Sequence, residues 1–196
     1  MLLAKITLKY KTLMWEPRRG VFYGPISPVY GIGAVVMVVF LVNNGKTPLI
    51  TFLTAALLGG VVEYLISFLQ EKVMGTTSWD YKNQILNING RTTIPFMLFW
   101  GLLGLLFTNF LYPLISNFIE SIPVNIGNNI TNLILSFLLI DMFISWTALI
   151  RQNMRRKNIS PYTKIGEICD QYYNDEYIDK KFPNMKITNG LLTKDR

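Results

Sequence analysis

Long apolar stretches alternate with shorter polar ones along this chain of 196 residues. A helix that crosses a bilayer needs about 20 mainly apolar residues at ~1.5 Å of rise per residue. Four stretches approach or reach that length, at about residues 28–42, 48–70, 94–118 and 130–150. The first is the shortest. Counted from Ser27 it covers about 24 Å, so Val21 to Ile26 are needed to complete a crossing.

This pattern predicts an all-α fold, a polytopic membrane helical bundle with four transmembrane helices and a polar cytoplasmic C-terminal tail. We expect a basic N-terminal segment over residues 1–20, a transmembrane domain over 21–150 and the tail over 151–196. Composition agrees, because 51% of the residues are hydrophobic and only 16% are charged, against roughly 25% charged in an ordinary soluble domain. The alternative is a soluble domain with very buried helices, and the length of the apolar stretches argues against it.

Lysine and arginine are distributed unevenly between the polar segments, and this bias sets the orientation of a membrane protein. Two of the loops share a single positive residue, Lys46. The other segments hold twelve, namely Lys5, Lys9, Lys11, Arg18, Arg19, Lys72, Lys82, Arg91, Arg151, Arg155, Arg156 and Lys157. We therefore expect a multi-pass protein of the cell membrane, with both termini and the 72–93 loop in the cytoplasm. This bias and anionic lipid headgroups account for the net charge of +7, so nucleic acid is not an expected partner.

Several kinds of chemistry find no support in the sequence. There is no histidine, and the single cysteine, Cys169, has no second cysteine to pair with. Asn43 to Thr47 resembles the end of a phosphate-binding loop, but Phe40 stands where that motif requires glycine. Haem, zinc and dinucleotide signatures are also missing. We therefore expect no cofactor and no metal, and the lipid bilayer as the first partner.

Two acidic residues lie inside the apolar stretches, where an ionisable group costs at least ~2.5–3.5 kcal/mol. Glu63 stands among small and polar residues at helical spacing, so we expect it to face the bundle interior. It holds helices together, through an arginine or a tyrosine hydroxyl, or it binds a substrate or proton, or it is an exposed or neutralised acid. Asp141 shares a helix face with Ser145, Ala148 and Gln152. That face is either a packing seam, which we favour, or the wall of an aqueous cavity.

The entry to the first apolar stretch is rich in helix-breaking residues. It reads RRGVFYGPISPVYGIGA and includes Gly24, Pro25, Tyr30 and Gly31. In lipid, irregular backbone survives only where protein or a water-filled cavity shields it. We expect residues 20–29 to form a broken or extended entry near the cytoplasmic face, with the regular helix starting near Pro28. Such interruptions build binding sites in transporters, although a plain bent helix start explains the pattern equally well.

The 72–93 loop is the most informative polar stretch. It contains Trp79, Asp80, Tyr81, Asn89 and Arg91, and Asn89-Gly90 is a turn signal. The simpler interpretation is an interfacial loop whose aromatic rings lie among lipid headgroups. The more specific one is a cytoplasm-facing pocket formed by Glu63, Asp80, Asn89 and Arg91, with Arg91 turned towards Glu63. Periodicity alone does not choose between them.

The tail contains one approximate helical stripe, at Ile165, Ile168, Tyr172 and Tyr173. It predicts a short amphipathic helix that packs on the membrane surface or against the cytoplasmic loops. A partly ordered tail fits the sequence as well.

Three ordered motifs resemble a known family. They are RGVFYGPISPVYGIGA, VVEYLISFLQEKVMGTTSWDY and NINGRTTIPFMLFWGLLG, within about residues 19–113. Together they are similar to the family called "Putative ABC-transporter type IV", whose members are labelled ABC transporter permeases. The residues that carry the resemblance are Gly24, Pro25, Tyr30, Gly31, Glu63, Tyr64, Trp79, Asp80, Tyr81, Asn89, Gly90 and Arg91.

The resemblance implies a membrane permease subunit without its own ATPase, so a separate ATPase subunit would dock on the 72–93 loop and the tail. Members of the family usually carry a further apolar helix before these motifs, whereas residues 1–19 are too polar and too short to span. A five-helix version would place the N-terminus outside, and the lysine-rich start favours the inside.

The first functional hypothesis is therefore a permease-like subunit, with substrate bound in a cytoplasm-facing cavity around Glu63 and Arg91. Asp80, Asn89, Trp79, Tyr81, Gly24, Pro25, Tyr30, Gly31 and Asp141 complete the candidate binding set. A membrane-embedded, lipid-modifying enzyme is the second hypothesis, and the lack of histidine argues against it. A regulatory or scaffold subunit is the third. Because four helices make a thin bundle, a transport pathway would favour a homodimer.

Overall fold

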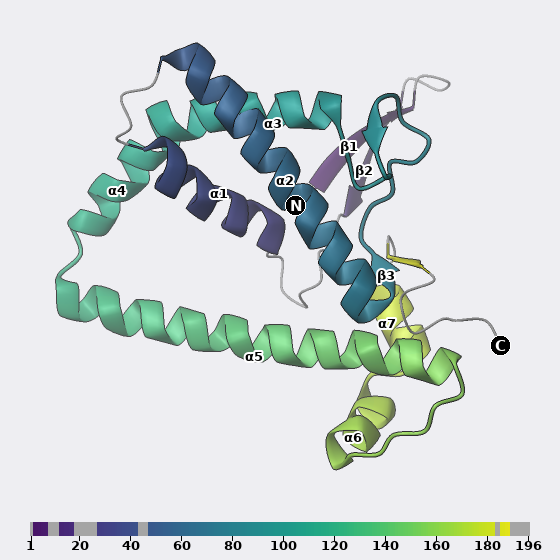
Figure 1. Ribbon diagram of the computed structural model, residues 1–196. Coiled ribbons are helices and arrows are strands. Elements are labelled where there is room, and N and C mark those ends of the chain that lie inside the picture. The colour runs from purple at the N-terminus through teal and green to yellow at the C-terminus, as the bar shows by residue number, and fades with distance from the viewer. Residues whose placement is uncertain (1, 8–11, 18–26, 43–46, 183–184, 189–196) are drawn as a thin grey trace. The chain divides into compact units, whose positions relative to one another are not determined.

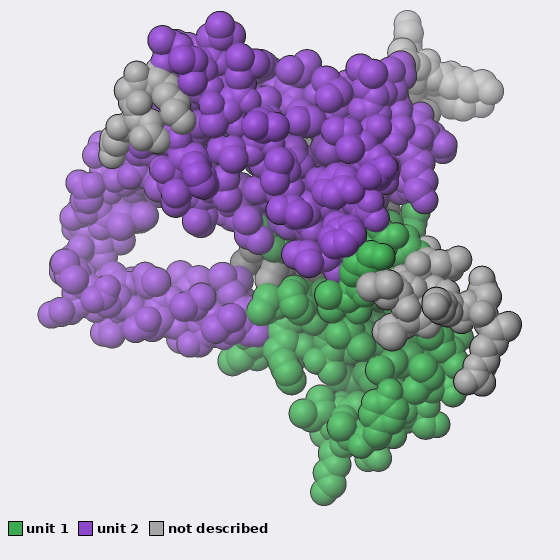
Figure 2. All heavy atoms as spheres, viewed as in Figure 1, with its two compact units in different colours: residues 1–28, 71–78, 140–196 green, residues 29–70, 79–139 purple. Residues whose placement is uncertain are grey.

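The computed structural model describes residues 2–7, 12–17, 27–42, 47–182 and 185–188. About 75% of the structure is helical, as Figure 1 shows. The helices are α1 (Pro28–Leu41), α2 (Pro48–Met74), α3 (Ile94–Leu106), a π-helical turn (Phe107–Leu111), α4 (Tyr112–Glu120), α5 (Val124–Arg156), α6 (Lys164–Tyr172) and α7 (Asp175–Lys181). By contact the chain divides into two compact units, residues 1–28, 71–78 and 140–196, and residues 29–70 and 79–139 (Figure 2). We call them unit 1 and unit 2.

Three helical segments of the described chain are long and apolar enough to cross a membrane: Pro48–Met74, Ile94–Glu120 and Val124–Arg156. The prediction of a mostly helical chain with apolar helices long enough to span a membrane is therefore confirmed. Helix α1 begins at Pro28, as the sequence indicated, but has only 14 residues, about 21 Å. Because residues 21–26 lie outside the described part of the chain, the fourth crossing stays a prediction.

Local signals explain where α2 starts and stops. Pro48 occupies the first helical position, where its missing N–H costs nothing. The other end closes at Gly75, whose N–H donates to the carbonyl of Glu71 at 3.0 Å. Gly75 has a φ of +64°, a left-handed conformation that glycine adopts without a steric penalty.

The second long segment is interrupted in its middle. It starts at the N-cap Thr93, whose Oγ1 accepts from the N–H of Phe96. The π-helical turn Phe107–Leu111 precedes Pro113, which has no N–H to donate and whose ring would crowd the preceding turn. Here Thr108 Oγ1 donates to the carbonyl of Gly104 at 2.9 Å. Proline and the hydroxyl thus account for the change of helical type.

Small residues in unit 2 let three helices approach each other closely. Trp100 of α3, only 6% exposed, lies against Gly33 of α1 and Gly59 of α2. A Cβ added at Gly59 would lie 2.3 Å from the Trp100 ring, and one added at Gly104 would lie 2.2 Å from the Cβ of Ala55. Small residues of α2 and α3 therefore let these two helices approach each other closely.

Unit 1 packs the tail on the last turns of α5. Ala148 and Leu149 join Met74, Ile178 and Phe182 in one apolar cluster. Next to it, Arg151 donates to both carboxylate oxygens of Asp170, at 3.1 and 2.6 Å. Further pairs along α5 are Arg155 with Asp170 and Asp175, Arg156 with Asp179, and Gln152 with Asp179.

These contacts shift the pKa values of two tail residues. Hydrogen bonds, first from Arg151 and then from Arg155, lower the pKa of Asp170. Burial raises the pKa of the Cys169 thiol. The tail over residues 164–181 is thus two ordered helices, which settles the choice between an ordered and a partly ordered tail for this stretch.

Three short two-stranded ladders complete the described structure, and the all-α prediction did not include them. They pair β1 (Leu2–Thr7) with β2 (Thr12–Pro17), β3 (Thr76–Thr77) with β6 (Lys186–Ile187), and β4 (Asn87–Ile88) with β5 (Thr92–Thr93), all antiparallel. The strands of the second and third ladders have two residues each, too few for an alternating pattern, whereas β1 and β2 have six residues each.

Candidate functional site

The candidate site lies in unit 2, where the loop that follows α2 returns to form a small hairpin before α3. Strands β4 and β5 are joined through Asn89 and Gly90, whose φ values are +53° and +70°. An Asn-Gly pair adopts this conformation more readily than other dipeptides. The side chain of Asn87 closes the turn by accepting from the N–H of Gly90 at 3.0 Å. The turn signal in the sequence is therefore confirmed.

Glu63 is the buried acid at the centre of the site. It is 7% exposed and stands on α2, 11 residues before the end of that helix at Met74. One carboxylate oxygen accepts from the hydroxyl of Tyr81 at 3.0 Å and the other accepts from Thr92 Oγ1 at 2.8 Å. One of the partners that the sequence suggested for Glu63, a tyrosine hydroxyl, is present in the structure.

The two hydroxyl donors are themselves held in place. Tyr81 is 3% exposed and its ring stacks on Phe96 at a centroid distance of 4.8 Å. Its N–H donates to the carbonyl of Gly90 at 2.8 Å. Thr92 is 2% exposed and lies in β5, directly before the N-cap Thr93. The loop and the start of α3 therefore present two fixed O–H groups to one carboxylate.

Arg91 and Asn89 meet the neighbouring residue of α2, Tyr64. Arg91 Nη1 lies 3.4 Å from the Tyr64 hydroxyl, and Asn89 Nδ2 donates to the same oxygen at 3.0 Å. The guanidinium lies 5.3 Å from the centroid of the Tyr64 ring and 5.4 Å from that of Phe68. This is cation–π distance, and stacking of this kind suits the planar guanidinium.

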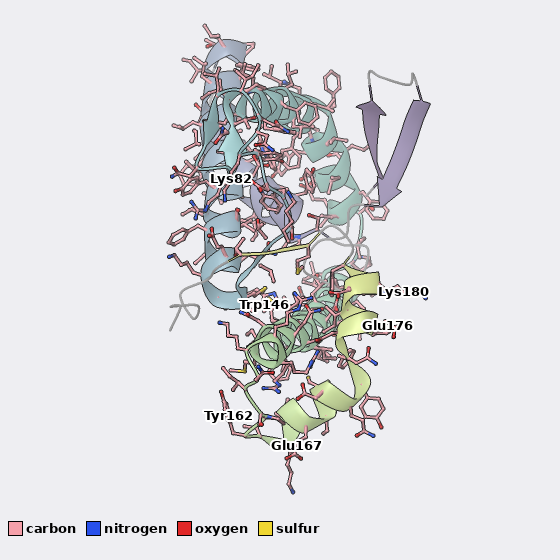
Figure 3. The ribbon with its side chains drawn as sticks, turned by 90° about the vertical axis from the view of Figure 1, so that its right-hand side faces the viewer. Lys82, Trp146, Tyr162, Glu167, Glu176 and Lys180 are labelled. Carbon is pink, nitrogen blue, oxygen red and sulfur yellow. The ribbon has the colours of Figure 1, made fainter. Side chains whose placement is uncertain are left out.

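Trp79 and Asp80 shape the loop around this cluster. Trp79 Nε1 donates to the carbonyl of Arg91 at 2.8 Å. Asp80 is exposed, and its Oδ1 accepts from the N–H of Lys82 at 3.0 Å. Figure 3 labels Lys82 on this loop. Of the predicted pocket Glu63, Asp80, Asn89 and Arg91, the structure thus gives Glu63 hydroxyl partners, places Asn89 and Arg91 on Tyr64, and uses Asp80 to hold a turn.

The remaining candidates lie elsewhere. Gly24 and Pro25 are outside the described residues. Tyr30 packs its ring at 5.7 Å from Trp100, while Gly31 is exposed on α1 and a Cβ added there would meet nothing within 4 Å. Asp141 belongs to unit 1, is 8% exposed and accepts from Ser145 Oγ at 3.1 Å.

The face that follows Asp141 along α5 is buried. Ser145 and Ala148 are fully buried and Gln152 is 3% exposed. Ala148 belongs to the apolar cluster of unit 1, and Gln152 donates to Asp179 of α7. These contacts support the packing seam that we favoured over an aqueous cavity.

Two residues of the site escaped the sequence analysis. Thr92 was not singled out, although the pair Thr92-Thr93 before Ile94-Pro95 is a helix-start signal that would have drawn attention to it. Phe68 stands four residues after Tyr64, the spacing at which aromatic side chains share a helix face. Among the described residues, no group of three or more Cys, Asp or Glu side chains could hold a metal ion.

Comparison with known proteins bears on the motifs that build this site. A family model described as "Putative ABC-transporter type IV" matches residues 3–146. The chain belongs to this family. The match is wider than the three motifs and includes all of α1 to α4, the hairpin and most of α5, whereas α6 and α7 lie beyond it. No curated protein and no solved structure matches the chain significantly. Membership and three apolar helices together fit a component of a membrane transporter.

Proposed function

We propose that the protein is a permease-like membrane subunit in which Glu63 binds the positively charged group of a substrate, or a proton. The observation that carries the proposal is the hydroxyl-bound carboxylate at the centre of unit 2. An acidic group in a membrane helix is costly and marks a functional site by default. Two observations support the proposal: the chain belongs to the family described as "Putative ABC-transporter type IV", and Glu63 connects α2 to a polar loop.

The chemistry of the donors supports exchange with a ligand. A hydroxyl is neutral and rotates about one bond, so it can donate to a carboxylate or accept from an incoming cation. Tyr81 and Thr92 would donate to Glu63 in the absence of substrate and then yield part of that role to an ammonium group.

Substitution of Glu63 is the direct test. We expect Glu63→Gln to abolish uptake into everted membrane vesicles, measured with radiolabelled polyamines, cationic amino acids and basic dipeptides, while the amount of protein in the membrane is unchanged. Glu120→Gln is the matched control, because Glu120 is an exposed acid at the end of α4 and should tolerate the change. If wild-type vesicles and Glu63→Gln vesicles take up every one of these probes equally, the proposed site is wrong.

Folding must be separated from transport. We expect the Glu63→Gln protein to elute from size-exclusion chromatography in detergent as the wild type does. If it aggregates there, Glu63 is a structural residue and its proposed role in binding is refuted.

Transport by this family implies an energy source, and we propose a separate ATPase subunit that docks on the loop before α3. The tip of that loop exposes two aliphatic side chains, Ile85 at 82% and Leu86 at 63%. Affinity purification from native membranes should recover ATP hydrolysis with the wild type and much less with Ile85→Ser/Leu86→Ser. Gln84→Ser is the control at the same tip. Equal recovery with all three proteins would exclude this surface.

A further inference from the structure

Helix α6 is attached to α5 through its small and polar face. Gly166 and Cys169 are buried, and a Cβ added at Gly166 would lie 3.5 Å from Cδ of Arg151. Asp170 on the same face binds Arg151 and Arg155. The sequence analysis identified the stripe of Ile165, Ile168, Tyr172 and Tyr173, which would normally be the packing face. Three of those four side chains are exposed instead, because the arginine pairs fix the rotation of the helix.

The exposed surface of α6 has two distinct sides. Ile165, Ile168 and Tyr172 are 51%, 53% and 66% exposed, and at ~100° per residue they form one stripe. The centre of that stripe lies about 120° from the face that is buried on α5. It lies about 100° from the side formed by Lys164, Glu167 and Gln171. Tyr162, just before the helix, is 73% exposed. Figure 3 shows Glu167 on the side of α6 away from α5 and Tyr162 beside the segment that precedes the helix.

The ion pairs also fix the position of α6 along α5. Arg151 directly follows Ile150, the last residue of the apolar stretch. The chain turns back after α5, so that α6 lies beside the last turns of that helix (Figure 1). Asp170 is therefore held at the level of Arg151 and Arg155, within about 8 Å of the apolar end. That is the depth of lipid headgroups.

The surface of α5 on this side is apolar and exposed. Leu133, Phe137 and Ile140 are 72%, 59% and 60% exposed. Together with the partly exposed Ile144 they follow the spacing i, i+4, i+7, i+11, and Arg151 completes the same row. Arg151, which binds α6, thus lies on the same face of α5 as this apolar row. The row itself would contact acyl chains.

We propose that α6 is an interfacial helix whose stripe of Tyr162, Ile165, Ile168 and Tyr172 lies in the bilayer at the boundary of headgroups and acyl chains. A helix of this kind needs an apolar side in lipid and a polar side in water, and α6 has both besides the face on α5. Tyrosine and aliphatic residues suit this zone, since amphipathic rings settle at headgroup level. The tail is then tied to the membrane by α6 and to α5 by arginine–aspartate pairs.

Fluorescence quenching tests the position of each side. In a Cys169→Ser background, a bimane label is attached at Ile168→Cys or Tyr172→Cys on the stripe, and at Glu167→Cys or Gln171→Cys on the polar side. The labelled proteins are reconstituted in vesicles of phosphatidylethanolamine and phosphatidylglycerol. We expect lipids with brominated acyl chains to quench the two stripe labels several-fold more strongly than the two polar-side labels, and aqueous iodide to show the reverse order.

Each other result would overturn the proposal. Equal responses at the four positions would mean that α6 is not at the interface. Shielding of the stripe from both quenchers would mean that protein covers it, whether a second copy or another subunit.

The unsubstituted protein gives an independent measurement that a labelling artefact cannot affect. After irradiation in vesicles that contain a diazirine-bearing phospholipid, mass spectrometry should find lipid adducts on the peptide with Ile165 and Ile168. Adducts confined to the long apolar helices would contradict the proposal. This inference does not depend on what the protein transports.

Discussion

At the scale of single residues, hydroxyl groups donate to both acids that stand inside apolar helices. Glu63 accepts from Tyr81 and Thr92, and Asp141 accepts from Ser145. A neutral donor costs less to bury than a second charge. It also leaves the acid able to change partner, which is what a binding role for Glu63 requires.

The Thr92 hydroxyl should contribute measurably to stability. Thr92→Val keeps the shape of the side chain but leaves one oxygen of a buried carboxylate without this donor, at a cost of about 1–3 kcal/mol. We expect a lower midpoint of thermal unfolding in detergent for Thr92→Val and a nearly unchanged one for Thr92→Ser. Equal midpoints for Thr92→Val and the wild type would show that the 2.8 Å contact contributes little.

The pairing of Asp170 predicts a dependence of stability on pH. Its pKa in the folded protein lies below the ordinary value, first because of Arg151. A carboxylate with a lowered pKa in the folded protein contributes to stability above about pH 4. That contribution is lost as the pH falls through the folded pKa. The free energy of unfolding of the wild-type protein should therefore fall as the pH drops below about 4 and through the folded pKa of Asp170.

Asp170→Asn is the variant that isolates this carboxylate. We expect it to be less stable than the wild type at neutral pH, by about 1–3 kcal/mol, since Arg151 and Arg155 each lose a charged hydrogen-bond partner. Its unfolding midpoint should depend less on acidic pH. If the two proteins show the same pH profile from neutral to acid, other carboxylates control the acid response.

At the scale of elements, glycine positions set how closely helices approach. The Cβ of Ala55 is bonded directly to the backbone of α2, so it cannot rotate aside when Gly104 gains a methyl group. The same addition at Gly31 meets open space. These two glycines therefore respond differently to one chemical change.

We expect Gly104→Ala to destabilise the protein by about 1–3 kcal/mol through overpacking. Gly31→Ala should be neutral or slightly stabilising, because alanine favours the helix and nothing obstructs it. Thermal unfolding of both variants in the same detergent provides the comparison. A stable Gly104→Ala protein would show that α2 and α3 can separate slightly at no cost.

The helices also show which structural properties local sequence patterns can predict. Pro28, Pro48 and Thr93-Ile94-Pro95 mark helix starts by local stereochemistry, so α1, α2 and α3 begin where the sequence indicates. The rotation of α6 was not predictable in the same way. Its apolar periodicity favours burial of Ile165 and Ile168, yet the arginine–aspartate pairs hold the other face against α5. Those pairs join residues 15 to 20 positions apart, beyond what a local pattern can encode.

At the scale of the whole molecule, family membership and three long apolar helices fit a membrane transporter component, and orientation is the next property to determine. The positive residues predict that both termini lie in the cytoplasm. Three of the arginines used in that argument, Arg151, Arg155 and Arg156, pair with tail carboxylates. The positive-inside rule counts lysine and arginine and not net charge, so the prediction stands.

Reporter fusions test the orientation. We expect green fluorescent protein fused after Arg196 to fluoresce, and alkaline phosphatase inserted in the short connection between α4 and α5, after Ser121, to be active. Both results require that α5 crosses the membrane once, and with a cytoplasmic N-terminus they imply an even number of crossings before the tail. An inactive phosphatase together with a dark fluorescent protein would reverse the orientation of α5.

The sequence by itself determined that the long helices suit a bilayer, where they start and that they contain acids. Apolar length, proline and glycine stereochemistry, and charge act locally along the chain, so they can be recognised without the fold. Only the tertiary structure decided which groups those acids meet. Thr92 reaches Glu63 across 29 residues, Arg91 turns to Tyr64 and Phe68, and α6 exposes its apolar side. Each of these groups has several possible partners, and the packing of distant segments decides which one it contacts.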